Sequence, residues 1–478
     1  MIDYNVLEND ILGRMLMQLD QGFEAMHVEL KKNQWMGPGQ AAQAWLKHIK
    51  APSKKEFKEL CDTNKTASGM FDAARRSYLG GWFEPFRHGH VGDCFEYDVN
   101  SAYPMVISTL PCLLHGKWTE GVGKPNNSHD YSLVHAKVSG SDPIAGAMNY
   151  REDKHRIFRP SAARGWYWWH ELQASKRAGL IDTIEVNRWF HYEKCDCPPP
   201  FQSIRELYLE RLKVGKNSPR GKASKLVYNS GYGKMAQSIG NPRYANPIYA
   251  SLITAGCRVM ILGAIETHPT RTKDLVKIAT DGIYFRKPHP YLPLSKDELG
   301  KWDMKEKKNL TVMMPGLYWD DESRDRVRAG ETPKLKSRGV PGHAMAKFIF
   351  DIDEQFSKFN PGDCWPNVKI DIPFTFIGPK LALARGDWKL CARVPYHHRG
   401  KDGPISDVKE LSADPKLKRK AVYRDDIGII TTRPYGGSIE FECVPYQKDF
   451  GMEFEENKLV PTDGYEDFTQ EIREVLNG

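Results

Sequence analysis

Acidic side chains occur at two points of the chain where they could bind a metal ion. Asp98 follows the aromatic residue Tyr97 and precedes the segment Val99-Asn100-Ser101-Ala102-Tyr103-Pro104. A carboxylate at the end of a strand is a typical Mg²⁺ ligand, and the backbone N–H groups of the following turn can bind a triphosphate. Asp281 likewise ends the hydrophobic segment 276–280 and precedes a glycine. These positions predict two strand ends that each present one metal-binding carboxylate.

A basic helical segment lies between the two aspartates. It reads Lys225-Leu226-Val227-Tyr228-Asn229-Ser230-Gly231-Tyr232-Gly233. On a helix, Lys225 and Asn229 are four residues apart and share a face, which can present an ammonium group and an amide to a phosphorylated ligand. The two glycines leave room for a close approach to the backbone. More basic residues and a turn precede this segment, so residues 202–239 are predicted to form a basic helical hairpin.

In this order, the three segments resemble the motifs of family B DNA polymerases. The first matches D-x-x-S-L-Y-P with Ala102 at the leucine position, and the second matches every fixed position of K-x-x-x-N-S-x-Y-G. The third is similar to a diverged Y-x-D-T-D-S, in which Ala279 replaces the first Asp, Gly282 replaces the Ser, and Asp281 keeps the metal-binding position. Each residue also has an ordinary structural explanation, as a strand cap, a core aromatic or a surface lysine. The order of the motifs therefore carries the interpretation.

Two weaker matches place the chain nearest the protein-primed, phage-type branch of that family. Tyr78-Leu79-Gly80-Gly81 resembles the Y-x-G-G segment of protein-primed relatives. Lys336-Ser337-Arg338-Gly339-Val340 resembles their K-x-R-G-V element. The resemblance covers about residues 75–345.

The resemblance implies an α+β fold with the right-hand polymerase architecture: a palm with an antiparallel sheet, helical-hairpin fingers and a mixed thumb. The expected domains are an N-terminal helical segment over 1–74 (a remnant or docking site of an exonuclease domain), the first part of the palm over 75–200, the fingers over 201–233, the second part of the palm over 234–335, and the thumb with the C-terminal region over 336–478. Apolar patterns predict further helices over 40–49 and 250–267, and strands over 131–138, 184–190, 276–279 and 283–285.

The same resemblance implies template-directed DNA synthesis, in which deoxynucleotides are added to a primer 3′-hydroxyl by two-metal nucleotidyl transfer. The catalytic and metal-binding groups would be Asp98, Asp281 and the Val99 carbonyl, with two Mg²⁺ ions as cofactors and Mn²⁺ as a substitute. The deoxynucleoside triphosphate would be bound by Asn100, Ser101, Ala102, Tyr103 (the steric gate against ribonucleotides), Arg211, Lys213, Lys225 and Asn229. Primer–template DNA would be bound by Tyr78, Gly80, Gly81, Tyr232, Gly233, Thr280, Lys336, Arg338 and Gly339.

A proofreading exonuclease, which usually precedes the polymerase in this family, is not expected within this chain. Such a domain opens with a D-x-E pair, and none occurs in residues 1–97. Residues 4–12 nevertheless resemble the helix that closes an exonuclease domain. A separate exonuclease subunit that contacts the N-terminal helices, near residues 1–35, is therefore a further partner that the resemblance implies.

Three alternatives stay open. A reverse transcriptase or RNA polymerase shares a two-carboxylate palm but is not expected to carry K-x-x-x-N-S-x-Y-G. A primase-like enzyme that starts chains without a primer is compatible with the same motifs. An inactive DNA-binding scaffold is favoured by Ala279 and Gly282, which stand where the family has an acid and a serine.

The composition is typical of a globular protein with a polyanionic partner. Lys and Arg outnumber Asp and Glu by 69 to 61, which gives a net charge of +8. Of nine cysteines, only Cys195 and Cys197 are close in sequence, and a C-x-C pair alone does not build a zinc site. Free thiols in a reducing compartment are therefore expected. No apolar run of bilayer-spanning length and no signal peptide are expected, which predicts no membrane partner and a cytoplasmic location, in the host cytoplasm if the protein is phage-encoded.

Overall fold

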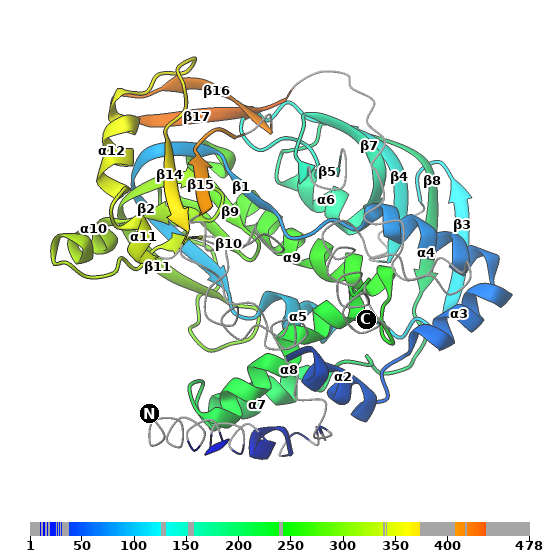
Figure 1. Cartoon of the computed structure of the whole chain (residues 1–478). Coiled ribbons are helices and arrows are strands. Elements are labelled where there is room, and N and C mark those ends of the chain that lie inside the picture. Colours follow the sequence, from blue (N-terminus) through cyan, green and yellow to red (C-terminus); the bar gives the residue numbers. More distant parts are fainter. Residues whose placement is uncertain are drawn as a thin grey trace, which may run out of the picture. The chain divides into compact units, whose positions relative to one another are not determined.

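A computed structural model describes most of the chain between residues 38 and 435. The described residues are 10, 13, 14, 17, 20–24, 26, 28, 30, 38–125, 131–151, 157–238, 242–337, 340, 342–372, 407–415 and 418–435. Helices and strands mix along the sequence, so the expected α+β class is confirmed (Figure 1). The chain packs as two compact units. The first comprises Met1–Phe83, Glu96–Lys305 and Arg433–Glu453, and the second comprises Glu84–Phe95, Glu306–Thr432 and Phe454–Gly478. The expected domain boundaries stay predictions.

The first unit contains a four-stranded antiparallel sheet. Its order is β3 (Lys117–Val122), β8 (Thr183–Glu193), β4 (Ser132–Ser139) and β7 (Ala162–Trp168). Along β4, Leu133 packs into one apolar cluster, whereas Val134 and Val138 pack into another, because successive side chains of a strand point to opposite faces. The first cluster includes residues of α4 (Lys65–Ser77), and the second includes Leu172 of α6 (Trp169–Arg177). The sheet is thus covered on both faces.

The longest described helix, α9 (Pro247–Thr267), is part of this core. The Asn246 side chain accepts a hydrogen bond from the backbone of Tyr249, and Pro247 occupies the first turn, which is how a helix N-terminus is commonly specified. The sequence expectation that no apolar run reaches bilayer-spanning length is wrong for this helix. It is long and apolar enough to cross a membrane, but 78% of its most apolar window is buried, as in the core helix of a globular protein.

The predicted basic helical hairpin is present as α7 (Ile204–Lys213) and α8 (Pro219–Met235). Ser218 caps α8, since its hydroxyl accepts a hydrogen bond from the Gly221 N–H at 3.0 Å. α2 (Pro38–His48) packs along α8, where its Trp45 ring lies 3.8 Å from the position of a Cβ at Gly231. The N-terminal helical segment therefore contacts the hairpin directly.

Shorter elements complete the first unit. Helix α3 (Lys54–Thr63) begins with a capping box in which Ser53 and Glu56 bond each other's backbone N–H groups. The remaining elements are α5 (Ala102–Ile107), β5 (Tyr150–Arg151), β6 (Ile157–Phe158), the 3₁₀ turn η1 (Arg271–Asp274), β9 (Leu275–Ala279) and β10 (Gly282–Phe285). The predicted strands at 131–138, 184–190, 276–279 and 283–285 correspond to β4, β8, β9 and β10.

The described part of the second unit contains antiparallel strand pairs and three helices. Its apolar cluster joins Trp319, Ile352 and Ile430. The same unit contains a buried ion pair between Arg419 and Glu84 (3.0 Å). Four strands have residues assigned to both units: β1 (Phe83–Pro85), β2 (Arg87–Val99), β11 (Trp302–Met314) and β17 (Ile429–Pro434). The other elements are β12 (Leu317–Trp319), α10 (Asp321–Arg328), β13 (Lys336–Ser337), α11 (Gly342–Met345), α12 (Ile349–Lys358), β14 (Asn367–Ile372), β15 (Asp407–Ser412) and β16 (Arg419–Arg424).

Candidate active site

The two predicted metal-binding aspartates lie on neighbouring strand ends of the first unit. Asp98 is the last residue but one of β2, and Asp281 lies in the turn between β9 and β10. The backbone N–H of Val99 donates to the Asp281 carbonyl at 3.0 Å, which sets the end of β2 against this turn. A Cβ placed on Gly282 would be 3.3 Å from Asp98 Oδ1, so the Asp98 carboxylate faces the turn.

The backbone next to both aspartates is in an unusual conformation. Thr280, directly before Asp281, has φ +65°, and Ser101, three residues after Asp98, has φ +53°. A positive φ is uncommon for any residue with a Cβ and is strained for a β-branched one, and such strain concentrates at functional sites. The Thr280 N–H donates to the carbonyl of Trp82 at 2.8 Å, which holds the strained turn. Both turns of the candidate site therefore contain a residue with positive φ, and the Thr280 turn is held by a bond from outside it.

Aromatic residues from three of the predicted motifs meet beside these turns. The rings of Tyr103 and Tyr232 lie 4.7 Å apart between centroids, and the hydroxyls of Tyr78 and Tyr232 are hydrogen-bonded to each other. A Cβ on Gly81 would lie 2.6 Å from Thr280 Cγ2 and 3.1 Å from the Tyr103 hydroxyl. The fold thus brings the Y-x-G-G segment and all three longer motifs into one place.

The two aspartates also act electrostatically on a buried thiol beside the turn. Cys257 of α9 lies beside the turn, with its Sγ 3.4 Å from the Thr280 carbonyl oxygen. Burial raises the pKa of the Cys257 thiol, and the carboxylates of Asp281 and Asp98 raise it further. Burial likewise raises the pKa of Tyr103. Both carboxylates therefore act on the same small volume, where a divalent cation would offset their charge.

Arg258 is an important residue that the motif comparison missed. It is buried on α9 and forms a bidentate ion pair with Glu171 of α6, at 2.6 and 2.8 Å. Its Nη1 also donates to the carbonyls of Leu79 and Gly80, at 2.8 and 2.7 Å. The only available signal was an arginine within an otherwise apolar helix, because a buried charge must be paired. Arg258 positions the Y-x-G-G segment.

Comparison with known proteins decides the family. The sequence profile described as DNA polymerase type B, organellar and viral, matches residues 1–246, just over half of the 478 residues. The chain belongs to this family. A DNA polymerase of Acidianus bottle-shaped virus (isolate Italy/Pozzuoli) is 30% identical over 300 residues. The matched region makes up 59% of this chain but only 41% of the viral protein, so the chain spans under half of that relative. The predicted membership of family B is confirmed.

Solved structures of family B polymerases resemble the chain loosely. Phi29 DNA polymerase in an orthorhombic crystal form has a TM-score of 0.45 at 14% identity, over 83% of this chain and 67% of the other. Phi29 DNA polymerase complexed with single-stranded DNA has a TM-score of 0.45 at 16% identity, over 88% of this chain and 68% of the other. The family B DNA polymerase of Pyrobaculum calidifontis has a TM-score of 0.27 at 15% identity, over 70% of this chain and 41% of the other. Likenesses this loose do not place individual elements or residues of this chain.

The predicted nucleotide-binding residues fall into two groups in this member of family B. The first group follows Asp98 in the sequence. In this group, the Asn100 side-chain amide donates a hydrogen bond to the Ser295 carbonyl at 2.6 Å, and Ala102 is buried in the first turn of α5. The second lies on the hairpin, where Arg211 joins α7 to α8 by donating to the Gly221 carbonyl at 3.2 Å. Lys213, Lys225, Asn229 and Gly233 are exposed on the hairpin.

The predicted K-x-R-G-V element lies in the second unit. Lys336 is the first residue of β13, whose backbone pairs with β12. Arg338 and Gly339 lie outside the described residues. The roles assigned to all of these residues stay predictions.

Proposed function

We propose that this chain is a template-directed DNA polymerase that adds deoxynucleotides to a primer 3′-hydroxyl by two-metal nucleotidyl transfer. The observation that carries the proposal is the meeting of Asp98 and Asp281 on adjacent strand ends, beside Tyr103 and Tyr232. Membership of family B and a viral relative called a DNA polymerase support it. The expected palm, fingers and thumb are part of the same proposal, with the α7–α8 hairpin as fingers.

The side chains present fit a pair of divalent cations. Mg²⁺ prefers carboxylate and carbonyl oxygens, and the Asp98 carboxylate faces the turn that carries Asp281. These two carboxylates and the Val99 carbonyl would hold two Mg²⁺ ions, or Mn²⁺ in their place. Bound there, the ions would lower the pKa of the primer hydroxyl and neutralise charge on the departing pyrophosphate.

The chain's own residues would bind and select the nucleotide. Tyr103 would lie under the sugar and exclude a 2′-hydroxyl, because its ring is held against Tyr232 and cannot turn aside freely. Lys225, with Arg211 or Lys213, would neutralise charge on the β- and γ-phosphates. Tyr78, Gly80, Gly81, Tyr232, Gly233 and Thr280 would contact primer–template DNA, together with Lys336, Arg338 and Gly339.

Primer extension tests the proposal. With Mg²⁺ and a labelled primer–template, we expect Asp98→Asn and Asp281→Asn each to reduce extension about a thousandfold or more, since metal binding is worth several kcal/mol in the transition state. Asp182→Asn, which changes an exposed aspartate of the same unit, is the matched control and should extend like the wild type. Wild-type extension by either active-site variant would refute the assignment.

Two other functions would give different results in the same experiment. A primase-like enzyme would synthesise DNA on a single-stranded template without a primer. An inactive scaffold, favoured by Ala279 and Gly282, would bind primer–template in a salt-sensitive way without extending it. The expectations of no exonuclease in this chain, of a separate exonuclease subunit and of a cytoplasmic location stay predictions.

A further inference from the structure

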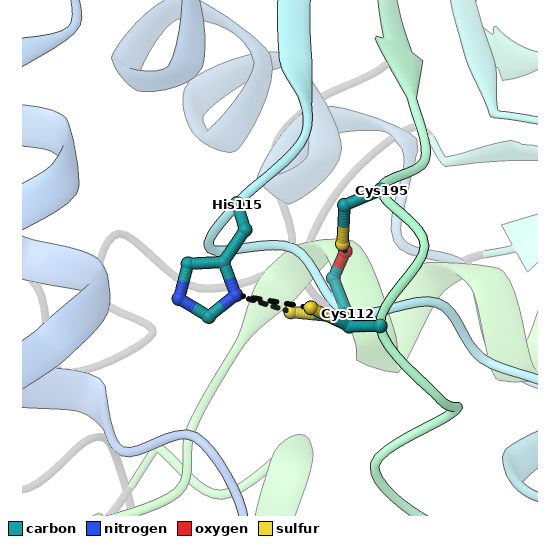
Figure 2. Close-up of side chains that lie close together, drawn as sticks. Cys112, His115 and Cys195 are labelled. Atoms are coloured by element: carbon teal, nitrogen blue, oxygen red, sulfur yellow. Dashed lines mark hydrogen bonds between the residues drawn. The ribbon is translucent and has the colours of Figure 1, made fainter.

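Three cysteines and a histidine come together at one end of the β3–β8 strand pair. Cys112 and His115 lie just before β3, and Cys195 and Cys197 lie just after β8. The antiparallel register pairs Lys117 with Glu193, so the residues that precede β3 lie opposite those that follow β8. The four ligand atoms all lie within 4.8 Å of one another. Figure 2 shows Cys112, His115 and Cys195 converging from these two segments.

The distances fit a tetrahedral metal ion. The Sγ atoms of Cys112 and Cys197 are each 3.4 Å from Nδ1 of His115. In a tetrahedral zinc site with ordinary Zn–S and Zn–N bonds, a sulfur and a nitrogen ligand are about 3.5 Å apart. One nitrogen donor and three sulfur donors therefore already have nearly the separation that a single ion requires.

The surrounding residues fix this arrangement independently of any metal. The Tyr192 hydroxyl of β8 hydrogen-bonds the Cys112 carbonyl and accepts from the Gly116 N–H at 2.8 Å. A Cβ on Gly116 would lie 2.2 Å from the Glu193 carbonyl oxygen, so only glycine permits this approach. The Tyr249 hydroxyl of α9 donates to the Pro111 carbonyl at 2.9 Å. The segment that carries Cys112 and His115 is thus held in place by two buried tyrosines, one of which lies on β8 shortly before Cys195.

We propose that Cys112, His115, Cys195 and Cys197 bind one structural Zn²⁺ ion. A set of three thiolates and one imidazole is typical of zinc, and four protein ligands leave no open position for a substrate, which is the pattern of a structural rather than a catalytic site. Cys61, Cys94, Cys257 and Cys364, the other described cysteines, lie outside the cluster.

The position of this site in the chain explains what the ion would stabilise. Cys112 follows α5, the helix that begins at Ala102 next to Asp98, and Cys197 precedes α7, the first helix of the hairpin. Zinc bound here would tie the segment after α5 to the segment before α7. The ion would therefore hold the base of the α7–α8 hairpin at a fixed distance from the candidate active site.

Metal analysis of the purified chain tests the proposal. Full-length protein prepared under reducing conditions with zinc should contain one zinc per chain by mass spectrometry. Cys195→Ser and Cys197→Ser should each lose most of it, whereas Cys61→Ser, a half-buried thiol of α3, should retain it. Asp98→Asn should also retain its zinc while losing extension, so failure of this site and failure of the polymerase proposal give different results.

Cobalt exchange of the wild type removes the dependence on variants that fail to fold. Co²⁺ in a tetrahedral site with three thiolates gives intense d–d bands and sulfur-to-metal charge-transfer bands, which are weak or absent in octahedral oxygen sites. We expect these bands at one Co²⁺ per chain and their loss when Zn²⁺ is added. A chain without zinc that shows no such bands, or one in which thiol titration finds Cys112, Cys195 or Cys197 in a disulfide, would overturn the proposal.

Discussion

The contact between the Y-x-G-G segment and the Thr280 turn can be tested by adding one methyl group at Gly81. A Cβ there would lie 2.6 Å from Thr280 Cγ2 and 3.1 Å from the Tyr103 hydroxyl, well inside normal contact distances. The neighbouring Gly80 is a matched control, since a Cβ at that position meets nothing within 4 Å. Neither glycine has a positive φ, so alanine strains the backbone at neither site.

The two substitutions should have different effects on the free energy of unfolding. Gly81→Ala overpacks a fixed turn and should reduce the free energy of unfolding by about 1–3 kcal/mol. Gly80→Ala should be neutral or stabilising by up to about 1 kcal/mol, because alanine lowers the entropy of the unfolded chain. Displacing Thr280 also displaces Asp281, so Gly81→Ala should reduce primer extension about 10- to 100-fold beyond any loss of folded protein.

A double substitution identifies the contact responsible. Thr280→Ser removes Cγ2, the atom nearest to the added methyl group, and should restore part of the stability of Gly81→Ala, with a coupling energy of about 1 kcal/mol. Urea denaturation and primer extension on the four combinations measure both effects. Equal stability of Gly80→Ala and Gly81→Ala, or no coupling between positions 81 and 280, would refute the placement of this segment against the turn.

Two further predictions concern buried ionisable groups. Arg258→Met leaves Glu171 buried and unpaired and should reduce the free energy of unfolding by about 3–5 kcal/mol. Arg177→Met, the control, breaks an exposed ion pair of the same two helices and should reduce it by ~0–1 kcal/mol. Similar losses for the two variants in urea denaturation would contradict this prediction. Burial lowers the pKa of His88 from 6.5 to about 4. As the pH falls, the unfolded state therefore binds a proton before the folded state does. The free energy of unfolding of the second unit should decrease by roughly 3 kcal/mol between pH 6.5 and 4, and His88 should have no effect on it above this range. His88→Gln should flatten that part of the stability profile, and an unchanged profile would argue against the buried neutral imidazole.

Local patterns in the sequence predicted much of the secondary structure. The helices α2 and α9 and the α7–α8 hairpin were found from apolar spacing and turn residues, and β9 and β10 from two short hydrophobic runs around Asp281. Helices α3 and α4 were not individually predicted, although the capping box from Ser53 to Glu56 was a usable signal. The order of strands in a sheet depends on contacts between distant segments, which periodicity does not encode.

The candidate zinc site is the clearest example of a feature that local sequence patterns do not predict. Cys195 and Cys197 alone do not make a metal site, and no local pattern joins them to Cys112 and His115. Only the register of β3 with β8 brings the two pairs together. Asp98 and Asp281 could be predicted as metal ligands because a family motif supplied the missing long-range information, and no such motif covered the cysteines.

Helix α9 explains how a turn that has lost two motif residues can still be held in place. Three consecutive residues of this helix contact three different parts of the site. A Cβ on Gly256 would lie 2.8 Å from Val106 of α5, the Cys257 thiol hydrogen-bonds the Thr280 carbonyl, and Arg258 binds the carbonyls of Leu79 and Gly80. The backbone of the turn is thus fixed from outside the motif. Ala279 and Gly282 therefore alter the chemistry available beside Asp281 without removing the contacts that position it.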